Sequence, residues 1–300
     1  MKTFFLVATL FAVPTLAGAA SFAFIVAGLG GEPEYEERFR EETAVIGAAA
    51  VQAAGGDKSH VVILTGEQAR RDSLRRTFQE FAAKVKPTDS ATVVLIGHGT
   101  YDGEEYRFNV PGADITGSEL GQLFDRLSAK HQLIVNATSA SGATIELWQR
   151  PERVVSTATK SGGERTATRF AQYWGQAVSS DAADLNKDET VTAAEAFDYT
   201  NRQVAASYKS EVALATEHAR IAGEETAAFA VAHLGASALS GSSPEVAALL
   251  TQRGQIEQDL EGVKARKAAL GEDQYYDELE GVLVRLAQLQ KQIDAQRAVQ

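Results

Sequence analysis

The sequence predicts an α/β fold in which layers of helices enclose a mostly parallel sheet. The first observation is a set of short apolar runs that predict strands, at residues 22–27, 60–65, 92–96, 133–136 and 154–157. The second is a set of helical patterns between those runs, at residues 33–53, 67–84 and 118–127. Strands that alternate with helices are typical of a parallel sheet. The third is that the runs are almost wholly apolar, which indicates strands buried on both faces.

The helix expected at 118–127 has the clearest start signal. Thr116 can cap this helix, and Glu119 can reach back to the backbone of Thr116 in a capping box. A small hairpin is expected at 106–110, and the pattern from residue 164 to about 235 is mostly helical. We therefore assign residues 21–235 to one α/β domain.

The composition argues against a disordered, a nucleic-acid-binding and a disulfide-stabilised protein. The chain has 300 residues, of which 44% are hydrophobic, so it can bury a sizeable core and global disorder is excluded. The net charge is −11, and no basic block is longer than a pair such as Arg70 and Arg71, which disfavours binding to nucleic acids. The chain contains no cysteine, so its core must hold it without disulfides.

The first 20 residues have the pattern of a signal peptide. Lys2 precedes an apolar run from Phe4 to Leu16, and small residues follow at 17–20. We therefore expect export to the periplasm or out of the cell. The uncharged stretch 4–31 is also long enough to span a bilayer, which leaves an N-terminal membrane anchor as the alternative. We favour cleavage, after which no stable membrane span is expected, because Pro14 and the small residues interrupt the run.

The C-terminal part predicts a helical hairpin. Residues 236–244 are rich in serine and predict a linker, and residues 245–300 carry apolar residues at heptad spacing on either side of Gly271. Arg253 and Lys267 interrupt the first seam. The hairpin is expected to be antiparallel and to pack on itself or its own domain, with a partner or dimer interface as the alternative. The two seams are Val246, Leu249, Ile256, Leu260, Val263 and Leu270, and then Leu279, Val282, Leu286, Leu289 and Ile293.

Two turns at strand ends carry the candidate catalytic residues. His98 follows the third predicted strand and lies between Gly97 and Gly99, and Ser139 follows the fourth. In an open parallel sheet, ligands bind outside the carboxyl ends of the strands. This arrangement suits acyl transfer, with His98 as general base, Ser139 as nucleophile and the amides of Gly99 and Ser139 as oxyanion donors. The alternative is a structural histidine at a strand end.

The two turns, in this order and at this separation, resemble the catalytic core of the caspase and legumain cysteine peptidases, nearer to legumain. The resemblance extends over roughly residues 22–205. Its further parts are the opening strand at 24–30, the helix start at 114–120, the strand and loop at 154–159, and Ser141 and Gly142 after Ser139. It implies a caspase-like three-layer sandwich with His98 as the catalytic histidine, Gly97, Gly99, Ser141 and Gly142 as turn residues, and a peptide or protein ligand in the groove between His98 and Ser139.

In that family the nucleophilic cysteine stands where Ser139 stands in this chain. A thiolate is reactive near neutral pH, whereas a serine hydroxyl needs an aligned base that a third group orients. Asp102 follows His98 closely and is the candidate for that third group. We expect a pseudoenzyme that binds peptide-like ligands or partners without efficient cleavage. The alternatives are an active serine-type hydrolase, and a structural adaptor that acts through the helical hairpin.

Residues 184–195 resemble a calcium-binding loop. Asp184, Asn186 and Asp188 supply side-chain oxygens, Thr190 a backbone carbonyl, and Glu195 the final carboxylate. The departure is at residue 189, where a glutamate stands in place of the usual glycine. A structural Ca²⁺ is thus the one cofactor to test, and none is required. The alternative is an Asx-rich turn that leads into an N-capped helix.

Two further groups of charges receive structural interpretations. His218, next to Glu217, lies in a polar stretch expected to be helical, and we interpret it as a surface histidine. Acidic residues precede the first helix and favour its N-terminal dipole, with the rim of a basic substrate groove as the alternative. They are Glu32, Glu34, Glu36 and Glu37.

Overall fold

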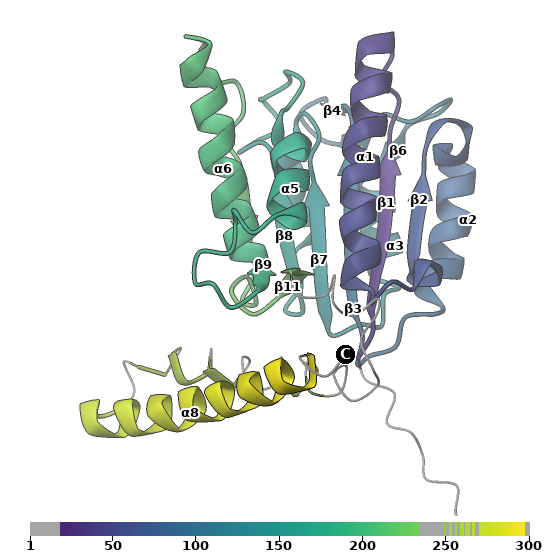
Figure 1. The fold of residues 1–300 in the computed structure, drawn as a ribbon. Coiled ribbons are helices and arrows are strands. Elements are labelled where there is room, and N and C mark those ends of the chain that lie inside the picture. The colour runs from purple at the N-terminus through teal and green to yellow at the C-terminus, as the bar shows by residue number, and fades with distance from the viewer. Residues whose placement is uncertain are drawn as a thin grey trace, which may run out of the picture.

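The computed structural model describes residues 19–234 and 270–297, together with residues 249, 252–253, 256, 259–260, 262–264 and 266–267. Its centre is a six-stranded sheet in the order β10-β8-β7-β3-β1-β2, in which β10 is antiparallel to β8 and the other strands are parallel (Figure 1). The strands are β1 Ser21–Ala27, β2 Val61–Leu64, β3 Ser90–Ile96, β7 His131–Asn136, β8 Arg153–Thr157 and β10 Arg220–Ala222. All five predicted strands are confirmed.

Helices cover both faces of this sheet, which confirms the predicted three-layer α/β sandwich (Figure 1). Alternate residues of β1 separate the two cores: Phe24 packs into the core that contains α2, α3 and α4, and Ile25 into the core that contains α1, α5 and α6. The helices are α1 Pro33–Ala53, α2 Arg71–Ala82, α3 Gly117–Phe124, α4 Ile145–Trp148, α5 Phe170–Ser179 and α6 Ala193–Ser210. Single turns of 3₁₀-helix occur at Lys58–His60, Gly66–Ala69 and Ser141–Thr144.

Two small sheets flank the central one. One has the order β4-β5-β6, with β4 Gly99–Tyr101, β5 Tyr106–Phe108 and β6 Ile115–Thr116, and it contains the expected hairpin. The other pairs β9 Thr190–Thr192 with β11 Ala230–His233. The expectation of mostly helical structure from residue 164 onward was therefore wrong for β9, β10 and β11. Strands of three or four residues contain too few side chains for a period of two to show in the sequence.

The start of α3 confirms one half of the expected capping box. The Thr116 side chain accepts a hydrogen bond from the backbone of Glu119 at 3.1 Å. The other half was wrong: the Glu119 carboxylate lies 2.7 Å from Arg71 and 3.5 Å from Arg75, both on α2. An opposite charge within reach outweighs a second bond to the helix end. Glu119 thus links two helices on the same face of the sheet.

The described part of the C-terminal region contains one long helix, α8 Glu272–Arg297. Val263, Tyr275 and Val282 pack together, and Arg266 pairs with Glu278 at 2.8 Å. A second ion pair joins Asp259 to Arg285 at 3.2 Å, so the contacts run in opposite directions along the two segments, as in an antiparallel hairpin. Arg253, expected to interrupt the seam, bonds to Glu189 at 3.0 Å and to Gln290 at 3.1 Å, and so links α8 to the loop before β9.

Several sequence-based expectations fall outside this part of the chain. Residues 1–18 of the predicted signal peptide, all of the predicted linker and much of the first hairpin helix lie outside the described residues. Within the described residues, no helix is both long and apolar enough to cross a bilayer.

Candidate functional site

The structure places His98 and Ser139 at the same edge of the sheet. His98 comes two residues after β3 ends, and Ser139 three residues after β7 ends. The two strands are adjacent and parallel, with Leu95 opposite Asn136. The strand order reverses between β1 and β3, and this switch point is where ligands bind in open α/β sheets. His98 therefore lies beside the position at which the topology favours a ligand, and Ser139 follows the next strand of the sheet.

Glycines let the turns at this edge touch one another. A Cβ added at Gly99 would lie 2.4 Å from the Ser139 carbonyl oxygen, and one added at Gly142 would lie 2.2 Å from the Ser161 amide nitrogen. Both distances are shorter than non-bonded atoms allow. A side chain at Gly99 would therefore push the His98 and Ser139 turns apart, and one at Gly142 would push the Ser139 turn away from the loop at 160–161.

His98 is half-buried against the first turns of α1. Its ring meets the Tyr35 ring edge-on at 4.8 Å and the Phe39 ring at 5.2 Å between centroids. Burial lowers the pKa of His98, as does the nearby Arg38 guanidinium, while a hydrogen bond to the backbone of Gly30 acts in the opposite direction. A lowered pKa favours the neutral imidazole, which can accept a proton.

One residue of the acidic cluster at the start of α1 supports the position of His98. The Glu36 carboxylate accepts a hydrogen bond from the Gly30 amide at 2.8 Å, and Gly30 in turn bonds the His98 ring through its backbone. Glu34 and Glu36 lie in the first turn of α1, where acidic side chains are favoured.

Ser139 is buried, with 2% of its surface exposed, and its Oγ has no hydrogen-bond partner. A serine nucleophile needs a hydrogen bond to its base, and His98 does not make one here. The residue after it, Ala140, has a left-handed backbone with φ 56°. The side chain of Ser139 thus sits in a tight, strained turn without the partner that would activate it.

A buried network of hydrogen bonds holds the Ser139 turn in place. The Thr138 hydroxyl bonds to Tyr106 at 2.6 Å and to Asn136 at 2.8 Å, and the Asn136 amide donates to Thr144 at 3.3 Å. Burial raises the pKa of Tyr106 to about 12, so its hydroxyl stays protonated. Buried networks whose members are all bonded rigidify their surroundings. The turn is therefore fixed in place although Ser139 Oγ is free.

A loop that we call the strap, residues 159–168, lies along the Ser139 turn. Thr159 accepts a hydrogen bond from the Gly142 amide at 2.8 Å. The Glu164 carbonyl accepts one from the Ala140 amide at 2.7 Å, and the Thr168 hydroxyl donates to the Ala137 carbonyl at 2.6 Å. These three bonds run along the whole turn on either side of Ser139, so the strap takes part in its burial.

The structure gives Asp102, the candidate third group, partners other than His98. The exposed Asp102 carboxylate accepts hydrogen bonds from the amides of Glu104 and Glu105 and from Arg107 at 2.6 Å, all within its own hairpin. The Glu105 amide is the largest cause of its lowered pKa, followed by Arg107. An aspartate at the start of a tight turn bonds its own backbone readily. The group that the structure places on the His98 ring is the Gly30 backbone.

In the predicted calcium loop, residue 189 has the backbone conformation expected at that position. Glu189 adopts φ 63°, the left-handed conformation for which glycine is usual at this position. Asp184 accepts bonds from the amides of Asp188 and Glu189 at 3.2 and 3.0 Å, and Asp188 accepts one from Thr190 at 2.8 Å. These are the bonds of an Asx-rich turn.

The end of this loop has the structure that we predicted as the alternative to a calcium site, a turn that leads into an N-capped helix. Thr192 and Glu195 form a complete capping box at the start of α6. Asn186 donates to Asp188 at 2.7 Å. Within the described part of the chain, no three acidic, histidine or cysteine side chains are grouped so as to hold a metal. Calcium binding stays a prediction.

The stretch around Glu217 differs from the expectation. It lies between α6 and β10 and is not helical, and Glu217 is 4% exposed. Its carboxylate accepts bonds from the Arg169 amide at 2.8 Å and the Tyr208 hydroxyl at 3.2 Å, and burial raises its pKa. His218 is exposed, as predicted, and lies 2.5 Å from Glu164.

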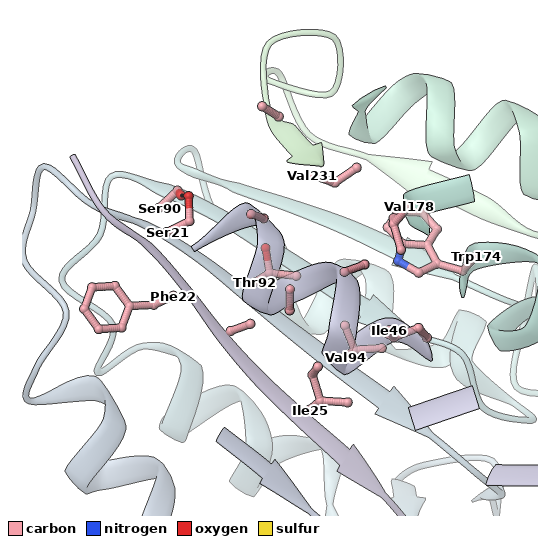
Figure 2. A pocket seen from close by; sticks show the side chains of 15 residues that line it. Ser21, Phe22, Ile25, Ile46, Ser90, Thr92, Val94, Trp174, Val178 and Val231 are labelled. Atoms are coloured by element: carbon pink, nitrogen blue, oxygen red, sulfur yellow. Dashed lines mark hydrogen bonds between the residues drawn. The ribbon is translucent and has the colours of Figure 1, made fainter. Parts of the chain in front are cut away.

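A hollow at the opposite, amino end of the sheet has a different character. Figure 2 shows Ile46 on α1, Trp174 and Val178 on α5, and Ile25 and Val94 on the sheet around this space. Its volume is about 40 Å³, which holds a few water-sized molecules. Its lining contains no acid, base or nucleophile apart from the hydroxyls of Ser21, Ser90 and Thr92. The candidate catalytic residues lie at the other, carboxyl end of the sheet.

No protein-family model matches this chain, and no curated protein matches it. Among solved structures, a protein of Geobacter sulfurreducens is similar with a TM-score of 0.46 and 10% identity, over 70% of this chain and 96% of that one. Caspase-1 from Spodoptera frugiperda is similar with a TM-score of 0.48 and 10% identity, over 68% of this chain and 86% of that one. These likenesses concern the fold alone.

Proposed function

We propose that this chain is an exported protein with a peptidase-like fold that binds a peptide or protein segment beside His98 and Ser139 without cleaving it efficiently. The observation that carries the proposal is the Ser139 hydroxyl, which is buried and has no hydrogen-bond partner. A hydroxyl in that state is a poor nucleophile, because its proton has nowhere to go. Binding needs no activated nucleophile, whereas cleavage needs the missing hydrogen bond.

The surroundings of His98 support the same conclusion. Its ring bonds the Gly30 backbone and packs between Tyr35 and Phe39. A cysteine at position 139 could act as a nucleophile even with a loosely held histidine as its base, because a thiolate forms near neutral pH. A serine needs a base held in line by a third group. Asp102 does not supply that group, since its carboxylate is bonded within its own hairpin.

An active serine hydrolase is the second candidate function, and one observation favours it. Burial lowers the pKa of His98, so the imidazole is neutral and able to act as a base near pH 7. Catalytic hydrogen bonds are often long in the free enzyme and tighten when substrate binds. In this case Ser139 would turn toward His98 in the complex.

An adaptor that acts through the hairpin is the third candidate. On α8, Tyr276, Leu283 and Val284 are each about half exposed, on a side of the helix other than the packed residues Tyr275 and Val282. Exposed apolar side chains on a helix are typical of partner or dimer contacts. This function would be insensitive to changes at Ser139.

A comparison of the wild-type protein with Ser139→Ala and Ser139→Cys separates these candidates. Hydrolysis of a mixed library of peptide esters and amides would be measured together with labelling by a serine-reactive phosphonate. We expect wild type and Ser139→Ala to be equally inert and to bind the same peptides, and Ser139→Cys to gain slow cleavage. Turnover or labelling that disappears in Ser139→Ala would establish a serine hydrolase. Absence of peptide binding by all three folded proteins would contradict the proposal and favour the hairpin.

A further inference from the structure

The loop that follows α6 presents two apolar side chains almost entirely to solvent. Val212 is 94% exposed and Leu214 is 86% exposed, and Ala213 between them is exposed as well. We call residues 212–214 the tip. Single exposed apolar side chains are common on protein surfaces, but here two neighbours with this degree of exposure form a small patch that the described part of the chain leaves uncovered.

The backbone of the tip belongs to a helix-ending turn in which glycine is usual. The Ala213 amide donates to the Tyr208 carbonyl at 2.9 Å, and the Val212 amide donates to the Lys209 carbonyl at 3.2 Å. These are the two bonds of a Schellman motif, and Val212 is its residue with the left-handed backbone, at φ 54°. A β-branched residue adopts this conformation at a cost, whereas glycine adopts it freely. Valine at this position therefore lowers the stability of the helix end.

Packing within the chain does not offset that cost. A side chain that lies almost wholly in solvent buries very little apolar area, so Val212 gains little from its own fold. Among the described non-glycine residues with a left-handed backbone, Val212 alone is β-branched. Strained positions of this kind cluster at active sites and ligand-binding surfaces. An apolar contact with another molecule would explain why a valine occupies the position.

Side chains at the base of the tip hold it in one conformation. The Tyr208 hydroxyl lies 3.0 Å from the Thr216 hydroxyl and donates to Glu217 at 3.2 Å, so it closes the loop across its base. Arg169 donates two hydrogen bonds to Glu211, at 2.7 and 2.6 Å, and its guanidinium lies 4.3 Å from the centre of the Tyr208 ring. A surface loop that is already fixed loses little conformational entropy when it binds a partner.

The segment that carries the tip lies at the carboxyl end of the sheet. It leads into β10, whose first residue Arg220 pairs with Thr157 at the end of β8. The His218 amide in this segment donates to the Glu164 carboxylate of the strap at 3.1 Å. The segment therefore borders the strap, on the edge of the sheet that carries Ser139.

The charge of the chain favours a peptide or protein over a membrane as the partner of the tip. A chain with a net charge of −11 is repelled by anionic lipid surfaces. Two apolar side chains also bury far less apolar area in a bilayer than stable anchoring needs. The same two side chains are sufficient to fill an apolar contact in a protein interface, where a few residues supply most of the affinity.

We infer that Val212 and Leu214 are contact residues for the peptide or protein ligand, which places an apolar side chain against the tip. The inference rests on the proposed function, because it takes its ligand from there. It adds a chemical requirement, at least one apolar residue outside the part of the ligand that lies beside His98 and Ser139. Burial of one valine side chain corresponds to about tenfold in affinity or more.

Substitutions at Val212 separate a contact residue from a position that is only strained. Val212→Gly and Val212→Asn both relieve the left-handed backbone, and the second retains a side chain and so limits flexibility. We expect both variants to unfold at a higher temperature than the wild type and to bind apolar peptides about tenfold more weakly. Val212→Ile retains the apolar side chain and should bind like the wild type. Binding would be measured by fluorescence anisotropy with labelled peptides from the mixed library.

Two controls accompany these variants. Leu214→Ser should weaken binding of the same peptides, whereas Leu185→Ser should not, because Leu185 is also well exposed but lies in the loop before β9. Peptides in which serine replaces the apolar residues form the second control. They should bind the wild type and Val212→Asn equally.

The outcomes distinguish this inference from the proposed function. Equal binding of apolar peptides by the wild type, Val212→Gly and Val212→Asn overturns the inference and leaves the proposed function standing. If no peptide binds any of the folded proteins, the proposed function is refuted, and the inference with it. Analytical ultracentrifugation tests a second copy of the chain as the occupant. A wild-type dimer that dissociates in Val212→Asn would show that the tip contacts another copy, and would overturn its assignment to a ligand.

Discussion

The two ends of the central sheet are built from the same strands but in different ways. At the amino end, α1, α5, β1 and β3 meet over a largely apolar hollow, where the polar side-chain groups are three hydroxyls and the indole nitrogen of Trp174 (Figure 2). At the carboxyl end, glycines and a buried network of hydrogen bonds hold the turn that contains Ser139. The amino end contains a small unfilled space, whereas the carboxyl end is closely packed around the unbonded hydroxyl of Ser139. The difference indicates that the chain stabilises its fold at one end and positions side chains at the other.

The two buried tryptophans give the sharpest test of this comparison. Trp174 lines the apolar hollow and stacks on Phe170, and Trp148 packs against Tyr106 under the Ser139 turn and donates to the Gly117 carbonyl at 2.8 Å. Either change to alanine should lower the free energy of unfolding by about 3–5 kcal/mol, measured by chemical denaturation.

The two tryptophan substitutions should differ in their effect on peptide binding. At temperatures where the variants are folded, we expect Trp174→Ala to bind peptide like the wild type and Trp148→Ala to bind more weakly. Equal loss of binding in both would mean that the two ends of the sheet are not separate in function.

The second prediction concerns a close contact at the carboxyl end. Gly142→Ala should lower the free energy of unfolding by about 3 kcal/mol, because its Cβ would lie 2.2 Å from the Ser161 amide nitrogen. Gly163→Ala, in the strap that Gly142 faces, is the matched control, since its Cβ would meet only the Ser161 hydroxyl, at 3.4 Å. Thermal unfolding of both variants checks the prediction. Similar losses of stability would show that the strap does not press on the turn.

Much of the fold could be predicted because burial on both faces leaves a strong pattern. The run that contains Ile25 and Val26 is apolar throughout, and both residues are fully buried in opposite cores. The same pattern failed for β9 and β10, which have three residues each. Glu119 has two competing partners, the helix backbone and Arg71, and only the packing of α2 on α3 decides between them.

The site could be predicted in part, for a related reason. His98 and Ser139 follow strong strands, so their positions at the sheet edge follow from topology alone. Arg38, Glu42 and Glu217 read as ordinary surface charges in the sequence, because their convergence depends on how α1, α5 and the segment before β10 come together. The spacing of four between Arg38 and Glu42 was a local signal, but it indicates a helix face and not burial.

The third prediction concerns the pH dependence of stability, which depends on the buried Glu42. The pKa of Glu42 is raised to about 7 in the folded protein, so its contribution to stability is complete below its unfolded value and is lost as the pH rises through 7. The free energy of unfolding should fall by on the order of 2 kcal/mol between about pH 5 and about pH 8. Glu42→Gln should remove most of this dependence, measured by urea denaturation at each pH. A wild-type profile that rises over this range would contradict the direction of the shift.

The smallest expected effect concerns the loop before β9, whose partner strand β11 contributes to the lining of the hollow at the amino end. Ca²⁺ at millimolar concentration should raise the free energy of unfolding by about 1 kcal/mol if the loop binds with the weak affinity typical of extracellular sites. The backbone favours this, because Glu189 already has the left-handed conformation that the loop requires. Against it, Asn186 donates a hydrogen bond to Asp188, and this bond would have to break for both side chains to turn their oxygens to the ion.

Two variants distinguish calcium binding by this loop from a purely structural role. Asp188→Ala should abolish any calcium effect, measured by thermal unfolding with Ca²⁺ and with a chelator. Glu189→Gly should strengthen calcium binding, because glycine adopts φ 63° without strain. It also removes the carboxylate that bonds Arg253 at 3.0 Å, so it should weaken the contact between α8 and this loop. If Ca²⁺ leaves all three proteins unchanged, the loop is an Asx-rich turn that caps α6, and its link to the hairpin through Arg253 is its structural role.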